Sequence, residues 1–335
     1  MNNKLKIGLI IVIIIFLMGI TLYLFKPTIK TYSRNLFYMD TYINIKVYTS
    51  NKSLANQSLD EAEKIYQTYH QLADRFTPYD NINNLYYIRH NKLTATNLNL
   101  DPKLYDLIKY GISWYNQSNG IKNINLGNVI DVWKKYRDLK TGIPSLNELK
   151  NAGSTNIKDI VLLPNNQILN NHPNIDLGSI VKGYATQVVG DYLKQVGLPK
   201  YLINAGGNVL VGDHDDDGVY RIGIQDPTKP NEVFQVVKGN NLAVVTSGGY
   251  QRFYEYQGVK YNHIIDPNTL FPADKYYSVS VVCDSSTLGD SLSLVLFVMD
   301  IEQGKALIKK YDNVEVIWYT KDNQIIKSSG FDKYE

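Results

Sequence analysis

Glycine, aspartate and small polar residues gather in four segments of the second half of the chain. In the first, IDLGSIVKGYA (residues 175–185), a strand-like end gives way to Gly178 and then to a predicted helix that carries Lys182. Free N–H groups at a helix start attract phosphate, and the lysine would add a full positive charge there. Asp176 could equally be an N-cap and Lys182 a solvated helix residue, so both interpretations stay open.

The second segment, NAGGNV (residues 204–209), directly follows an apolar strand pattern at residues 201–203. Two adjacent glycines, Gly206 and Gly207, would suit a backbone nest for an anionic group. They would suit a tight turn equally well. This segment therefore supports a phosphate site only in combination with the others.

The third segment joins TSGGYQRF (residues 246–253) with NHIIDPNTLFP (residues 262–272). His263 and Asp266 stand near the end of a predicted strand, just before Pro267 forces a turn. A histidine at such a sheet margin can carry a proton near neutral pH. The alternative is a histidine with a purely structural hydrogen bond.

The fourth segment, GDSLSLVLFV (residues 289–298), is expected to place Asp290 in the first turn of an otherwise apolar helix. A carboxylate there is either a partner of the helix dipole or a ligand for a hard metal ion. With carbonyl and hydroxyl oxygens beside it, it would suit Mg²⁺. It would not suit zinc, because the sequence has no Cys/His cluster.

The elements that must position these residues point to an α+β protein. Alternation of Ile43, Ile45 and Val47 predicts a strand over residues 42–48, and apolar residues then recur at helical spacing over residues 59–73. Asp101 and Pro102 form the N-cap and first turn of a second predicted helix. Strand patterns dominate later, at residues 201–204, 220–225, 233–237, 242–245, 252–256, 259–265 and 277–283. The pattern predicts mixed, mostly antiparallel sheets with flanking helices.

An uncharged apolar run of 19 residues occupies positions 7–25. It is long enough to cross a bilayer and longer than the apolar run of a typical signal peptide, which favours an uncleaved anchor. The only cysteine, Cys283, is far from this run and offers no lipid attachment there. We therefore expect a leader at residues 1–6, a transmembrane anchor at 7–25, a tether at 26–36 and a folded domain at 37–335. The folded domain is expected on the extracytoplasmic side of the cell membrane.

The charge pattern excludes one function class. The net charge is only +3 over 335 residues, and no Lys/Arg cluster interleaved with aromatic residues appears. Nucleic-acid binding is therefore not expected.

The order and spacing of the four segments resemble the ApbE-like family of FAD:protein FMN transferases. The resemblance runs from FYMDTYINI (residues 37–45) through IDLGSIVKGYA, INAGGNVLVG, RIGIQDP, TSGGYQRF and HIIDP to GDSLS. It covers nearly all of the chain after the apolar N-terminal run. It implies an ApbE-like catalytic domain in which the FAD diphosphate lies over the glycine-rich loops and Mg²⁺ bridges that diphosphate.

The resemblance also implies roles for individual residues. Catalytic roles fall on His263, Asp266 and Lys182, with His263 or Asp266 as the base. Metal binding falls on the Ser179 main-chain oxygen, Asp290 and Ser293. FAD contacts fall on Met39, Asn123, Asp176, Lys182, Gly206, Gly207, Asn208, Thr246, Ser247 and Ile265.

The implied reaction is attack by a threonine or serine hydroxyl of an acceptor redox protein on the FMN phosphorus, with AMP leaving. No D-G-x-S/T-G-A-T run occurs in this chain, so the acceptor is expected to be another protein. Two alternatives remain. The same site could split FAD with water as a Mg²⁺-dependent pyrophosphatase, or the chain could bind FAD without turnover.

Three positions depart from the family pattern. Leu294 stands where the family usually has a metal-binding threonine, and Lys122-Asn123 replaces the usual Phe-Asp pair. Leu270 replaces the glycine that usually follows the DPxT motif. The first two departures fall beside expected metal and flavin contacts.

Overall fold

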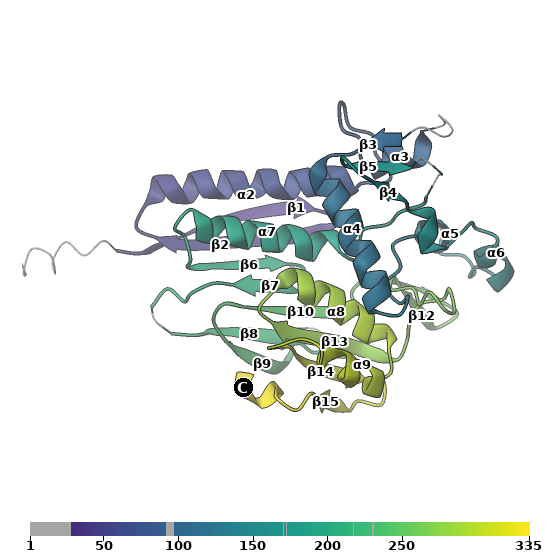
Figure 1. The fold of residues 1–335 in the computed structure, drawn as a ribbon. Helices are drawn as coiled ribbons and strands as arrows, with labels where there is room; N and C mark the ends of the chain where they lie inside the picture. The colour runs from purple at the N-terminus through teal and green to yellow at the C-terminus, as the bar shows by residue number, and fades with distance from the viewer. Residues whose placement is uncertain (1–27, 92–96, 170, 172, 217, 230) are drawn as a thin grey trace, which may run out of the picture.

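A large antiparallel sheet organises the molecule (Figure 1). The computed structural model describes residues 28–335 apart from 92–96, 170, 172, 217 and 230. Within these residues the sheet has eight strands, in the order β1-β2-β6-β7-β10-β13-β14-β15. Their bounds are β1 (Lys30–Tyr38), β2 (Thr41–Thr49), β6 (Tyr201–Ala205), β7 (Asn208–Val211), β10 (Leu242–Gly248), β13 (Tyr276–Cys283), β14 (Glu315–Thr320) and β15 (Ile325–Lys327).

The two faces of this sheet are covered differently. Alternate residues of β10 and β13 point to opposite sides, so Val245 and Val281 join the core under the helices, whereas Val244 and Val282 join a second core. The helical side carries α2 (Lys52–Ala73), α7 (Val181–Gln195) and α8 (Ser286–Val298). The opposite core is closed by the ribbon of β8 (Tyr220–Gln225) and β9 (Val233–Gly239).

Smaller elements surround the end of the sheet at which α7 begins (Figure 1). A third apolar cluster joins Trp133 and Tyr254, and so fixes a helix to a hairpin. These elements are α3 (Leu85–His90), α4 (Pro102–Gln117), α5 (Gly127–Leu139), α6 (Leu146–Lys150), α9 (Ile301–Ile308), the small sheet of β3 (Asn97–Asn99), β4 (Leu162–Leu163) and β5 (Gln167–Leu169), the hairpin of β11 (Phe253–Tyr256) and β12 (Val259–Asn262), and the 3₁₀ turn Ile157–Asp159. The 3₁₀ turn Phe331–Tyr334 instead packs against β9 and β14.

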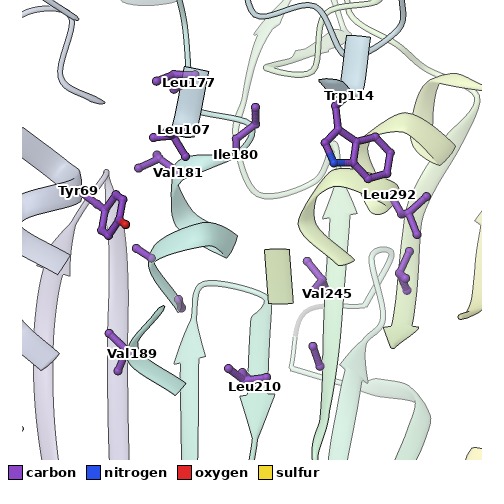
Figure 2. Packing of buried hydrophobic residues seen from close by; sticks show 14 of the residues in the cluster. Tyr69, Leu107, Trp114, Leu177, Ile180, Val181, Val189, Leu210, Val245 and Leu292 are labelled. Carbon is purple, nitrogen blue, oxygen red and sulfur yellow. The ribbon is translucent and has the colours of Figure 1, made fainter. Parts of the chain in front are cut away.

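Apolar packing holds the start of α7 in place (Figure 2). Ile180 and Val181 are 1% and 3% exposed and belong to the same cluster as Leu107 of α4 and Leu292 of α8. Burial of each such side chain contributes about 1.5–3 kcal/mol, so this helix start is firmly fixed relative to its neighbours.

Most expected elements are confirmed, and two boundaries were wrong. The strand at residues 42–48, the helix over residues 59–73 and the Asp101 N-cap are all present. The expected tether ends early, because Lys30–Tyr38 pairs with β2 as an edge strand. Helix α8 begins at Ser286, because the Ser285 hydroxyl accepts from the Leu288 N–H, so Asp290 lies beyond its first turn.

The expected leader and anchor lie outside the described residues. Among the residues that are described, no helix combines the length and the apolar character needed to cross a membrane.

Candidate functional site

Turns from distant parts of the chain meet at one end of the large sheet. The β1–β2 turn places Met39 and Asp40 in left-handed backbone conformations, with φ of 54° and 52°. The β6–β7 turn lies beside it through the pairing of β2 with β6, and the Thr246 N–H donates to the Gly207 carbonyl at 2.9 Å. Arg252 closes the group by donating to the Asp40 carbonyl and, at 3.1 Å, to Thr41 Oγ1.

His263 is held at this end of the sheet through one ring nitrogen, and among the described residues none bonds to the other. Its Nδ1 lies 3.3 Å from the Arg252 carbonyl, which can only accept, so we assign the ring proton to Nδ1 and leave Nε2 as an acceptor. The side chain is solvent-exposed although dense protein surrounds it. That surrounding protein, and then the charge of Arg252, lower the pKa of His263 to about 4. The imidazole is therefore neutral near pH 7 and can accept a proton.

A second group forms where α7 and α8 approach each other. Asp290 Oδ1 accepts from Lys182 Nζ at 3.2 Å, and Oδ2 accepts from the Gly183 N–H at 2.9 Å. A Cβ atom at position 183 would lie 2.4 Å from the Asp290 Cβ, so only glycine permits this approach. The carboxylate thus caps the start of α7 and orients Lys182 at the same time.

Lys122 completes this group. It lies just before α5, and its Nζ donates to the Ser179 carbonyl at 2.8 Å. The side chain is only 1% exposed, and this burial lowers its pKa to about 8, against the opposing charge of Asp290. The amine therefore keeps its proton at neutral pH. Lys122 was noted in the sequence as a departure from the family pattern, but no site role was expected for it.

Hydroxyl contacts connect the two groups. Ser247 Oγ at the end of β10 lies 2.9 Å from Ser293 Oγ on α8, and Ser293 is fully buried. Asn208 is also fully buried, and its Oδ1 lies 2.8 Å from Ser286 Oγ. The sheet end and the α7–α8 group therefore form one continuous site.

Three of the expected site residues form hydrogen bonds or an ion pair with other residues of the chain that were not expected in the site. Asp176 pairs with the buried Arg75 at 3.1 Å and accepts from the Gly178 N–H. Asn123 donates to the Thr155 carbonyl at 2.8 Å and shapes the loop before α5. Asp266 Oδ1 accepts from the Asn268 N–H at 2.8 Å and closes a turn. Their roles toward FAD or the acceptor stay predictions, as does the flavin contact of the buried Ile265.

The expected metal donors do not fit a Mg²⁺ ion as they stand. Mg²⁺ requires near-octahedral oxygen ligands at close range. The Ser179 carbonyl accepts from Lys122, both Asp290 oxygens accept from α7, and Ser293 bonds to Ser247. Leu294, at the position where the family usually has a metal-binding threonine, offers no oxygen.

Arg75 and Arg252 are structurally important residues that sequence reasoning did not select. Arg75 is 3% exposed and donates to Asp131 at 3.0 Å and to the Gly127 carbonyl at 3.0 Å. It follows directly after a predicted helix, but its partners lie 56 and 52 residues further along the chain. Only the fold brings them together.

The architecture and the site define a class of α+β protein that presents two lysines, a glycine-rich helix start and a neutral histidine at one end of an antiparallel sheet. The ApbE family model matches residues 39–318, and the chain belongs to that family.

Relatives and solved structures agree with this assignment. A Buchnera aphidicola protein named FAD:protein FMN transferase is 28% identical over 304 residues, covering 85% of this chain and 84% of its own. A Treponema pallidum protein of the same name is 30% identical over 254 residues, covering 69% of each chain. The ApbE protein of Thermotoga maritima has the same fold, with a TM-score of 0.82 at 24% identity over 91% of this chain and 99% of its own.

Proposed function

We propose that this chain is an FAD:protein FMN transferase, which moves the FMN group of FAD onto a threonine or serine hydroxyl of an acceptor redox protein. The names of the relatives support the reaction. The observation that carries it in this chain is the neutral His263 ring, whose Nε2 can accept a proton, because activation of a hydroxyl requires such a base.

The proposed step conserves atoms and charge. The acceptor hydroxyl gives its proton to His263 Nε2 while its oxygen attacks the FMN phosphorus. A new P–O ester bond forms, the bond to the AMP phosphate breaks, and AMP leaves with the displaced oxygen. The positive charge of Lys182 and the start of α7 stabilise the negative charge on the phosphate oxygens.

The other residues position this machinery. Asp290 holds Lys182 toward the site, and the charge of Lys182 adds to burial and the charge of Arg252 in lowering the pKa of His263. Arg252 holds the β1–β2 turn, which carries Met39, against the histidine. The proposed mechanism uses only groups of this chain, because the Lys122 ammonium bonds to the Ser179 carbonyl, where a Mg²⁺ ion was expected.

The proposed location follows from the N-terminal run at residues 7–25. A single-pass anchor there would hold the catalytic domain at the outer membrane face. An acceptor on that face would be a membrane or extracytoplasmic redox protein.

The test is a flavinylation assay. The full-length chain in detergent is incubated with FAD and a protein that carries a D-G-x-S/T-G-A-T segment, with and without Mg²⁺ and EDTA. In-gel flavin fluorescence and the mass of an added FMN should appear on the acceptor. They should be absent from an acceptor whose segment threonine or serine is alanine.

The other results of this assay distinguish the alternatives. Free FMN and AMP without an adduct would replace the proposal with the pyrophosphatase. Bound, intact FAD would show a binding protein without turnover.

A further inference from the structure

A buried ammonium group lies where the resemblance to the family places a metal ion. Lys122 Nζ reaches across 57 residues of sequence to the Ser179 carbonyl, the oxygen expected to bind Mg²⁺. An ammonium has three N–H donors, and one of them is used in this bond. A divalent cation at the same carbonyl would lie beside this ammonium group and would be repelled by its charge.

The cluster of Lys122, Lys182 and Asp290 has two positive charges and one negative charge. Lys122 and Lys182 both lie near Asp290, and each raises the cost of the other's charge. In the part of the chain that the structure describes, no ion pair joins either lysine to a second carboxylate. A buried cation costs several kcal/mol unless it is compensated, so an apolar side chain would fill this position at lower cost. A surplus positive charge of this kind is suited to an anionic ligand.

The position that would complete a metal site is also closed. Leu294 offers no oxygen, and the Ser293 hydroxyl is buried against Ser247. The departures at Lys122 and Leu294 thus both disfavour a bound metal ion. One adds a fixed cation, and the other removes a metal ligand.

We propose that the Lys122 ammonium takes the place of the divalent cation, so that this chain binds the FAD diphosphate through Lys122 and Lys182 without Mg²⁺. The inference deepens the proposed function and rests on it, because it concerns how the same site binds FAD. Lys182 is partly exposed and would contact the diphosphate at the start of α7, and the buried charge of Lys122 would act on the diphosphate from behind the Ser179 carbonyl.

The experiment measures binding rather than turnover. Equilibrium dialysis of FAD against the full-length chain in detergent is run in EDTA and in excess Mg²⁺. We expect the two dissociation constants to agree within about twofold, and titration of Mg²⁺ into the FAD complex to give no saturable heat. Lys122→Met should weaken FAD binding in EDTA by about ten- to a hundredfold, because it removes a positive charge that acts on the diphosphate at short range through a medium of low dielectric constant. The exposed Lys103→Met on α4 is the matched control.

A second variant guards against misfolding of Lys122→Met. The double variant Lys122→Phe/Leu294→Thr restores the residues usual in the family, and we expect it to bind FAD in Mg²⁺ and to lose that binding in EDTA. Such a gain of metal dependence cannot come from a damaged fold.

Several results would overturn the inference. FAD binding by the unaltered chain that needs Mg²⁺, or FAD affinity in EDTA that Lys122→Met leaves unchanged, would do so and leave the transferase proposal standing. Absence of FAD binding in both conditions would remove the proposed function together with the inference.

Discussion

His263 decides how the proposed reaction responds to pH. The surrounding protein and Arg252 lower the pKa of its imidazole to about 4, against an ordinary value of about 6.5. Protonation removes the Nε2 lone pair, so the reaction needs the form that dominates above this pKa. Initial rates of FMN transfer should therefore stay high as the pH falls through 6.5 and should decline only toward about pH 4.

A second variant, Arg252→Met, tests the cause of the low pKa. It removes a positive charge that lowers the pKa of His263, so the acid limb should move to higher pH. An acid limb near pH 6.5 in the unaltered chain would contradict the proposed state of His263.

Asp290 combines a structural and a positioning role, and its removal should show both. Asp290→Ala leaves the Gly183 N–H without its acceptor and Lys182 without its counter-charge. We expect a loss of about 1–3 kcal/mol in the free energy of unfolding and a large loss of FMN transfer. Urea denaturation and the in-gel assay measure the two effects. Asp191→Ala, an exposed carboxylate on α7, should change neither, and equal behaviour of the two variants would refute the role of Asp290.

At the scale of single residues, the sequence predicted that Lys182 and Asp290 share a site, but it did not predict the hydrogen-bond partners of Lys122 and Asp176. Lys182 and Asp290 were expected in one site, and the structure brings them to 3.2 Å. The partner of Lys122 could not be predicted, because no sequence pattern links a lysine to a carbonyl 57 residues away. Asp176 was expected to hold FAD, but its buried partner Arg75 lies 101 residues earlier in the chain.

Among the elements, the contact between α7 and α8 leaves no room for a side chain at position 183. Gly183→Ala would place a methyl group 2.4 Å from the Asp290 Cβ and 2.8 Å from the Ser286 carbonyl. The helices must then separate, and we expect a loss of about 1–3 kcal/mol in unfolding free energy, as for other overpacked positions. Thermal melts followed by circular dichroism would measure it. The exposed Lys194→Ala on the same helix is the control, and an unchanged melting temperature for Gly183→Ala would contradict this packing.

Helices and strands in which apolar residues recur with a regular period were predictable from the sequence, and elements without such a period were not. Ile43, Ile45 and Val47 of β2 are all fully buried, which is why their alternation was visible in the sequence. Strand β1 has only one buried residue, Leu36, because it lies at the edge of the sheet. A strand of this kind shows little alternation, so it was mistaken for a tether.

At the scale of the whole molecule, the N-terminal run should separate membrane attachment from catalysis. The full-length chain is expected to sediment with membranes, and a chain of residues 28–335 is expected to stay in the supernatant. Because β1 begins at Lys30, this truncation leaves the sheet intact, and the two forms should transfer FMN at similar rates in solution. A full-length chain found in the supernatant would refute the anchor.

The side of the membrane on which the folded domain lies can be measured separately. Protease added to intact cells should degrade the domain if it faces outward. Protection of the domain in intact cells, followed by cleavage after lysis, would place it on the inner side.

The bonds from Arg252 to the β1–β2 turn span 212 and 211 residues of sequence. Closing so long a loop carries a large entropic cost, which is recovered only when the intervening sheet has formed. A nascent chain that ends before Arg252 can form the first hairpin but cannot complete the nucleotide site. Capture of FAD therefore reports that the polypeptide has been synthesised past Arg252, in a chain of 335 residues, and that the sheet between the two partners has folded.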